Sequence, residues 1–86
     1  MVNYKDLIAD LLAAAIEDLT KEEIVNMIEV PSDEKMGDYA FPCFRLAKTL
    51  RKAPPLIAKD IAEKIADNEI FEKVENVNAY VNMYIS

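Results

Sequence analysis

The end of the sequence alternates two kinds of side chain, and one of the two sets could bind a nucleotide. In an extended strand over 79–85, successive side chains point to opposite faces, so Tyr80, Asn82 and Tyr84 share one face. A tyrosine ring can stack on an unstacked base, and an asparagine amide can form a bidentate pair with the edge of adenine. The same pattern also fits an ordinary solvated strand face, because tyrosine is common in strands. The spacing alone leaves both interpretations open, and on either one we expect Tyr80 and Asn82 to be exposed to solvent.

The composition argues against several catalytic chemistries. The chain has 86 residues, with no histidine and a single cysteine, Cys43. The usual zinc ligand sets cannot be assembled from these residues, and no histidine is available to activate Cys43 as a nucleophile. The apolar neighbours of Cys43 in segment 41–44 instead predict a buried structural thiol. We therefore expect no catalytic residue, no metal and no cofactor in this chain.

The single glycine, Gly37, lies in a polar loop over 31–38. Phosphate-binding loops need several glycines in fixed register, so Gly37 does not predict a phosphate site. Its expected use is a positive φ angle or a close approach to another segment of backbone.

The charge is unevenly distributed along the chain. The net charge is −6, from 10 basic and 16 acidic residues, and this opposes binding of phosphates by the chain as a whole. Residues 39–52 differ, because they contain four bases and no acids. On a helix over about 41–52, with Pro42 in its first turn, these bases share one side. That side either contacts phosphates or is simply solvated, and its members are Arg45, Lys48, Arg51 and Lys52.

The remaining pattern predicts a small α+β fold. Apolar residues at helical spacing indicate a helix over 3–18 capped by Asn3, and a second over 54–67 with an isoleucine at every fourth position. Thr20 begins a capping box, and the residues after it favour a helical turn leading into a strand at about 26–30. Strands at 70–76 and 79–85 should form an antiparallel hairpin. The prediction is one domain over residues 1–86, a small antiparallel sheet with three main helices packed against it.

The sequence also carries a prediction about location. No apolar run approaches the roughly 20 residues that a membrane span requires, and the first residues lack a signal-peptide pattern. We therefore expect a soluble cytoplasmic protein with no membrane partner.

Two groups of residues are similar to a known family. The most specific pieces are a turn at 37–40 followed by a Leu-Ala-Lys helix, and the aromatic-x-Asn pattern of Tyr80 and Asn82. In order and spacing they resemble the N-terminal additional domain of bacterial-type arginyl-tRNA synthetases, over nearly the whole chain. The matching segments are Ile28-Glu29-Val30-Pro31, Met36-Gly37-Asp38-Tyr39-Ala40-Phe41-Pro42, Leu46-Ala47-Lys48 and Ala79-Tyr80-Val81-Asn82-Met83.

The resemblance implies a domain that grips the elbow of the arginine-specific tRNA, chiefly its D-loop. In some members of the family the Tyr-x-Asn strand contacts an adenine there, and that role would fall here on Tyr80 and Asn82. The turn at 37–40 would be structural rather than catalytic. The parent protein would be an arginine–tRNA ligase, a class I synthetase that binds ATP in a catalytic domain outside this chain.

Two departures from the family pattern stand out. Ala79 occupies a position where the family often has glycine, which could alter the turn before Tyr80 or the orientation of its ring. The ATP motifs of the catalytic domain do not occur before Ser86, so this chain is not expected to be an enzyme by itself but a domain of a longer one. The main alternative is a standalone protein-interaction module that uses the exposed aromatic strand, and a small enzyme is the least supported class.

Overall fold

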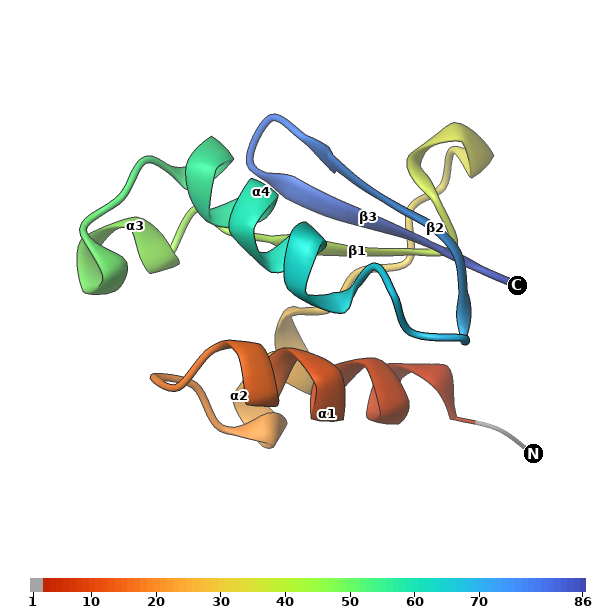
Figure 1. The fold of residues 1–86 in the computed structure, drawn as a ribbon, viewed down its shortest axis with the longest axis horizontal. Coiled ribbons are helices and arrows are strands. Elements are labelled where there is room, and N and C mark those ends of the chain that lie inside the picture. The colour runs from red at the N-terminus through yellow and green to blue at the C-terminus, as the bar shows by residue number, and fades with distance from the viewer. Residues whose placement is uncertain (1–2) are drawn as a thin grey trace.

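The computed structural model describes residues 3–86, which form helices and one three-stranded sheet (Figure 1). In chain order the elements are α1 (Tyr4–Ala15), α2 (Lys21–Met27), the 3-10 helix η1 (Glu34–Met36), β1 (Tyr39–Pro42), α3 (Leu46–Leu50), α4 (Pro54–Ile65), β2 (Phe71–Val77) and β3 (Tyr80–Ile85). The predicted α+β class with an antiparallel sheet is confirmed, although only α1 and α4 are long helices, at 12 residues each. Within residues 3–86, no helix is long and apolar enough to cross a membrane.

Local capping explains where the first two helices begin. The Asn3 side-chain oxygen accepts a hydrogen bond from the Asp6 N–H at 3.2 Å, as a cap of α1. Thr20 and Glu23 form the predicted capping box at the start of α2. α1 ends at Ala15, before the predicted residue 18, because the backbone of Ile16 is already extended.

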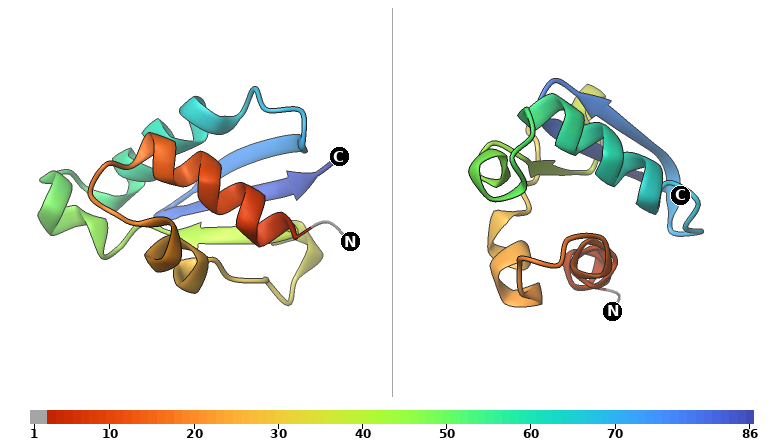
Figure 2. Two further views of the ribbon diagram at one scale, coloured as in Figure 1. Left: turned by 90° about the horizontal axis from the view of Figure 1, so that it is seen from below. Right: turned by 60° about the vertical axis from the view of Figure 1, so that its left-hand side comes forward.

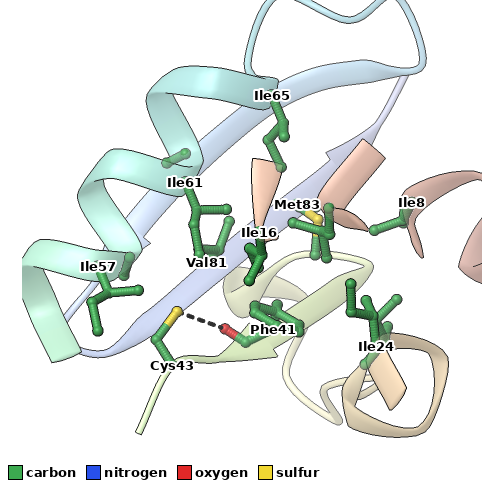
Figure 3. Close-up of a cluster of buried hydrophobic side chains, with 14 of the residues drawn as sticks. Ile8, Ile16, Ile24, Phe41, Cys43, Ile57, Ile61, Ile65, Val81 and Met83 are labelled. Atoms are coloured by element: carbon green, nitrogen blue, oxygen red, sulfur yellow. Dashed lines mark hydrogen bonds between the residues drawn. The ribbon is translucent and has the colours of Figure 1, made fainter. Parts of the chain in front are cut away.

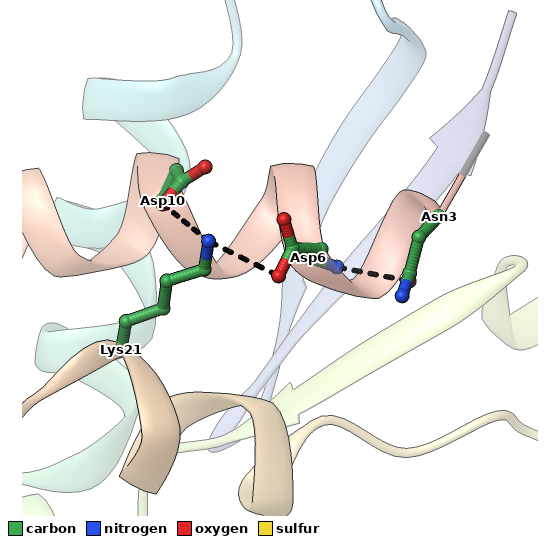
Figure 4. Close-up of polar contacts among 4 residues, drawn as sticks. All are labelled: Asn3, Asp6, Asp10 and Lys21. Atoms are coloured by element: carbon green, nitrogen blue, oxygen red, sulfur yellow. Dashed lines mark hydrogen bonds and ion pairs between the residues drawn. The ribbon is translucent and has the colours of Figure 1, made fainter.

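A lysine at the start of α2 links that helix to α1. Lys21 Nζ lies 3.0 Å from a carboxylate oxygen of Asp6 and 3.0 Å from one of Asp10 (Figure 4). Hydrogen bonds to Asp10 and then Asp6 raise the pKa of Lys21. These side chains are largely accessible to solvent, so their contribution to stability is small.

The strand order in the sheet is β1-β3-β2, and both pairings are antiparallel. β2 and β3 form the predicted hairpin, and β3, which carries Tyr80 and Asn82, is the central strand. In the turn between them Asn78 has φ 53, a left-handed angle that asparagine tolerates well. The turn therefore does not require glycine at Ala79, and the first departure from the family pattern has no backbone cost.

The core lies on the face of the sheet that α1 and α4 cover, which we call the inner face (Figures 1 and 2). Val81 and Met83 of β3 are fully buried there, as the alternation predicted. Against them α4 presents the predicted isoleucine stripe of Ile57, Ile61 and Ile65 (Figure 3). The stripe and the strand pattern together fix which side of β3 faces the helices.

The predicted helix over 41–52 is wrong in its first half. Residues Tyr39–Pro42 form β1, and α3 covers only Leu46–Leu50. Pro42 pairs with Tyr80 at the end of an edge strand, where a residue without an N–H group is tolerated.

The predicted strand over 26–30 is reduced to a single bridge. α2 continues to Met27, and Glu29 then pairs with Ala40 of β1 in an isolated antiparallel bridge. The Glu29 N–H donates to the Ala40 oxygen at 2.8 Å, and the Ala40 N–H donates back at 2.9 Å. The sheet is thus extended beyond β1 at this one position.

The loop before β1 is fastened to the end of β3 by Gly37 and Asp38, which we call the loop clamp. Gly37 has the predicted positive φ, at 95°, and a Cβ atom there would lie 2.8 Å from the Met83 carbonyl oxygen. The Asp38 N–H donates to that same oxygen at 2.8 Å, and the Asp38 carboxylate accepts from the Ile85 N–H at 2.8 Å. Glycine permits the close approach that these hydrogen bonds require.

Candidate nucleic-acid interface

The face of the sheet opposite α1 and α4, which we call the outer face, carries the alternating set that the sequence predicted. Tyr80, Asn82 and Tyr84 follow one another along β3. Residues that pair across neighbouring strands share a face of the sheet. The register therefore gives the neighbours on the outer face: Pro42 and Val77 beside Tyr80, Ala40 and Glu75 beside Asn82, and Lys73 beside Tyr84.

Asn82 is buried, and the prediction that it is exposed is wrong. Only 1% of its surface is accessible to solvent. Its side chain is short, and we attribute the burial to the longer side chains that surround it, those of Tyr80, Tyr84 and Glu75. Neither Oδ1 nor Nδ2 of Asn82 has a hydrogen-bond partner within residues 3–86. Because an unpaired buried polar group costs about 1–3 kcal/mol, this amide is an unused donor and acceptor at the centre of the sheet.

Tyr84 is held by contacts within the protein. Its hydroxyl donates to the Lys35 carbonyl oxygen at 2.6 Å, and Lys73 Nζ lies 4.3 Å from the centre of its ring. The same Nζ pairs with Glu75 Oε1 at 3.0 Å, and this hydrogen bond is the main cause that raises the pKa of Lys73. The hydroxyl and one ring face are thus occupied, and a contact between Tyr84 and nucleic acid stays a prediction.

Tyr80 lies at the more open end of the outer face. It is half-buried, and its ring meets that of Phe44 edge-on, with centroids 5.4 Å apart and planes at 81°. Phe44 itself is 55% exposed. The two rings border a cavity of about 290 Å³ whose other lining residues are Asn26, Met27, Glu29, Pro42 and Arg45. This volume is close to the lower end of the range for ligand pockets, about 300–1,000 Å³.

The predicted basic residues do not form one helical face. Only Lys48 lies within α3, while Arg45 precedes it and Arg51 follows it with φ 53. Lys52 pairs with Asp60 at 2.7 Å, and its hydrogen bond is the main cause that lowers the pKa of Asp60. Arg45, Lys48 and Arg51 make no ion pair within residues 3–86. Of these, Arg45 borders the cavity beside Tyr80.

Sequence reasoning missed several residues that line this cavity, above all Phe44, Asn26 and Glu29. Segment 41–44 alternates buried and more accessible residues in the structure, but its four residues show no matching alternation of polar and apolar types. Reading that segment as uniformly apolar concealed the exposed ring at its end. No local signal marked Asn26 or Glu29, since their place depends on the bridge between Glu29 and Ala40.

Cys43 is fully buried, as predicted. Burial raises the pKa of its thiol to about 12, so the thiol is neutral near pH 7. Its N–H donates to the Ala79 carbonyl oxygen at 2.8 Å and so joins the end of β1 to the residue before Tyr80. Cys43 therefore has a structural place beside the cavity.

Comparisons with known proteins give a consistent result. The family model described as the arginyl tRNA synthetase N terminal domain matches residues 4–85. An arginine–tRNA ligase of Alkaliphilus metalliredigens is 46% identical over 86 residues, covering 100% of this chain and 15% of that protein. One from Lactobacillus delbrueckii subsp. bulgaricus is 54% identical over 84 residues, again 15% of its length. The solved structure of Thermus thermophilus arginyl-tRNA synthetase matches with a TM-score of 0.75 and 28% identity, over 95% of this chain and 14% of that one.

Proposed function

Because the chain belongs to the arginyl-tRNA synthetase N-terminal domain family, we propose that it is the tRNA-binding accessory domain of an arginine–tRNA ligase. In this proposal the outer face of the sheet contacts the tRNA elbow through its D-loop. The chain spans about 15% of the length of the curated relatives, so arginine activation with ATP is assigned to a catalytic domain outside it. That catalytic domain and the arginine-specific tRNA are the proposed partners, in the cytoplasm.

The observation that carries the proposal is the unpartnered amide of Asn82. A buried polar group in a folded protein nearly always has a hydrogen-bond partner, yet both polar atoms of this side chain lack one within residues 3–86. An amide offers a donor and an acceptor at the spacing that matches the edge of adenine. A single-stranded base from the tRNA loop would supply both missing partners at once.

A base can reach Asn82 only if a covering side chain moves. Glu75 lies beside Asn82 on the outer face and is held by an ion pair with Lys73 whose partners are 52% and 43% exposed. Ion pairs this exposed are worth about 0–1 kcal/mol, so swinging Glu75 aside costs little compared with pairing the amide. The Asn82 amide is therefore closed to solvent in the free domain and can become accessible to a base at low cost.

Tyr80 and Asn82 would contribute to recognition in two different ways, by stacking and by base-specific hydrogen bonds. Stacking on the Tyr80 ring is tolerant of base identity and is worth about 1–3 kcal/mol. Pairing with Asn82 depends on base identity and contributes a similar amount, about 1–3 kcal/mol, to discrimination. Arg45, Lys48 and Arg51, which make no ion pair within residues 3–86, would supply positive charge for phosphates despite the net charge of −6.

The test measures tRNA binding and aminoacylation by the full ligase that carries this domain. Tyr80→Ala should weaken binding by about 1–3 kcal/mol whatever base occupies the D-loop position. Asn82→Ala should weaken only the tRNA with the favoured base and should remove the preference over a tRNA in which that base is changed. Binding of ATP and arginine should not change in either variant.

Asn76→Ala is the matched control. Asn76 is an exposed amide that pairs with Val81 across the sheet, so it belongs to the inner register rather than the outer face. Its loss should leave tRNA binding unchanged. An intact base preference in Asn82→Ala would reduce the Tyr-x-Asn pattern to a structural detail and overturn the proposal.

A further inference from the structure

The angle between the rings of Tyr80 and Phe44 determines whether one base or two can stack at this end of the domain. The two planes meet at 81° with centroids 5.4 Å apart. A base that stacks in parallel on Tyr80 therefore stands nearly perpendicular to Phe44 and cannot stack on both rings. Each ring can serve its own base, provided that the two bases are splayed apart, as bases in RNA loops often are.

The ring of Phe44 lies outside the hydrophobic core. It is 55% exposed, whereas its neighbour Cys43 and nearby Leu46 are buried. Exposed aromatic rings beside positive charge are the usual platforms for single-stranded nucleic acid. The ring of Phe44 is followed directly by Arg45, which makes no ion pair within residues 3–86.

A second cavity adjoins the first and is lined by residues of α2 and α3, and we call the two cavities together the groove. The cavity beside Tyr80 shares Asn26, Met27 and Arg45 with this second cavity of about 330 Å³. The second cavity is also lined by Leu19, Glu23, Leu46 and Thr49. The shared residues place the two cavities next to each other, with Arg45 bordering both.

The charges along this groove suggest how a nucleotide would lie in it. Glu29 lines the cavity on the Tyr80 side, where its carboxylate repels phosphate but can accept a hydrogen bond from a base amino group. Arg45 borders both cavities and can pair with a phosphate through its planar guanidinium. Bases would therefore point into the groove, and the phosphate between them would lie at Arg45.

We propose that Phe44 and Arg45 form a second nucleotide subsite, in which Phe44 stacks on the base next to the one held by Tyr80 and Asn82, and Arg45 binds the linking phosphate. This inference rests on the proposed function and deepens it, because it names a second nucleotide of the same RNA loop. The occupant follows from the second cavity adjoining the Tyr80 cavity at Arg45 and from the excess of basic residues over 39–52.

The test combines protein variants with tRNAs that lack a single base. In the full ligase, Phe44→Ala should weaken binding of intact tRNA about 5- to 150-fold, the range for loss of one stacked base. Phe44→Leu keeps an apolar side chain without a ring and should weaken binding in the same way. With a tRNA that lacks the base on one side of the nucleotide read by Asn82, the effect of Phe44→Ala should vanish. It should persist when the base read by Asn82 is the one removed.

Arg45 is tested through salt dependence. Arg45→Gln should reduce the slope of log affinity against log salt by roughly 0.7–0.9, the value for one lost phosphate contact. Lys59→Gln removes the same charge from an exposed position on α4 and should leave the slope unchanged.

The outcomes separate this inference from the proposed function. If Tyr80→Ala and Asn82→Ala weaken tRNA binding while both Phe44 variants bind normally, the second subsite is excluded and the proposed function stands. If the effect of Phe44→Ala persists with every single-base deletion, Phe44 acts by supporting Tyr80, and the second subsite is likewise excluded. If base preference is intact in Asn82→Ala, the proposed function itself fails.

Discussion

Tyr80 and Tyr84 occupy equivalent positions in the sequence pattern but different surroundings in the fold. Each lies two residues from Asn82 on the outer face of β3, and each is half-buried. Tyr84 donates its hydroxyl to Lys35 and lies under Lys73, next to the loop clamp. The hydroxyl of Tyr80 makes no hydrogen bond within residues 3–86, and its ring borders a cavity with Phe44.

The comparison shows that one strand can serve two purposes at its two ends. At the Tyr84 end the polar groups make contacts that hold the strand, so they are not available to bind another molecule. The ring of Tyr80 meets the edge-on ring of Phe44, and the amide of Asn82 has no hydrogen-bond partner within residues 3–86. In the proposed function, rigid support at one end positions Tyr80 and Asn82 for contact with a base.

The largest effect should come from the loop clamp at the Tyr84 end. Gly37→Ala forces a side chain into a backbone region that only glycine populates readily, which costs about 1–3 kcal/mol. The new Cβ would also lie 2.8 Å from the Met83 carbonyl oxygen, which is backbone and cannot turn aside. Chemical denaturation should therefore show a loss of stability at or above the upper end of that range.

Lys35→Ala is the control for this prediction. Lys35 is exposed and offers Tyr84 only its backbone carbonyl, which the alanine variant retains. Its unfolding free energy should match that of the original chain. Equal stability of the Gly37→Ala variant would mean that the clamp does not hold β3.

A second prediction probes the Tyr80 end through the pH dependence of stability. Burial raises the pKa of the Cys43 thiol from 9.0 to about 12 in the folded chain. Between these pH values the unfolded chain releases this proton and the folded chain retains it. The folded state then binds more protons, so stability falls as pH rises, by up to about 1.4 kcal/mol per pH unit.

Other groups also titrate above pH 9, so the measurement is a difference. Unfolding free energies of the original chain and of Cys43→Ala should diverge in slope above about pH 9 and run parallel below it. Parallel curves throughout would show that the thiol, and with it the end of β1 beside Ala79, is open to solvent.

The smallest effect compares the two tyrosines directly. Tyr84→Phe removes the 2.6 Å hydrogen bond to Lys35 and should lower the unfolding free energy by about 0.5–1.5 kcal/mol. Tyr80→Phe removes a hydroxyl that has no partner within residues 3–86 and should leave stability unchanged. Thermal or denaturant unfolding of the two variants, measured side by side, compares their losses of unfolding free energy. Equal losses would remove the distinction between the two ends.

Sequence patterns predicted those parts of the fold in which a single period dominates. The isoleucine stripe of α4 and the buried positions of Val81 and Met83 in β3 each follow from one period, and both are confirmed. Segment 41–52 was different, because Pro42 suits both the first turn of a helix and an edge strand. Its pairing with Tyr80, far along the chain, decides between the two.

The sequence predicted which face of β3 carries the candidate site, but not that Asn82 is buried there. Alternation correctly placed Asn82 on the face opposite Val81, yet Asn82 is buried. Its exposure depends on how far neighbouring side chains extend over it, such as that of Glu75, which pairs with Asn82 across the sheet. The sequence pattern does not specify how neighbouring side chains lie over one another, so the burial of Asn82 could not be predicted from it.

The direction of β3 has a mechanical consequence. Tyr80 begins the strand beside the hairpin turn, and the C-terminus lies at the other end of the molecule (Figure 1). Successive residues of a strand advance by about 3.4 Å, so Tyr80 and Ile85 are roughly 17 Å apart. A segment joined to Ser86 would be attached at the end of β3 remote from Tyr80. A small rotation about that attachment would therefore displace Tyr80 sideways. The rigidity of β3 then determines how precisely Tyr80 is positioned relative to that segment.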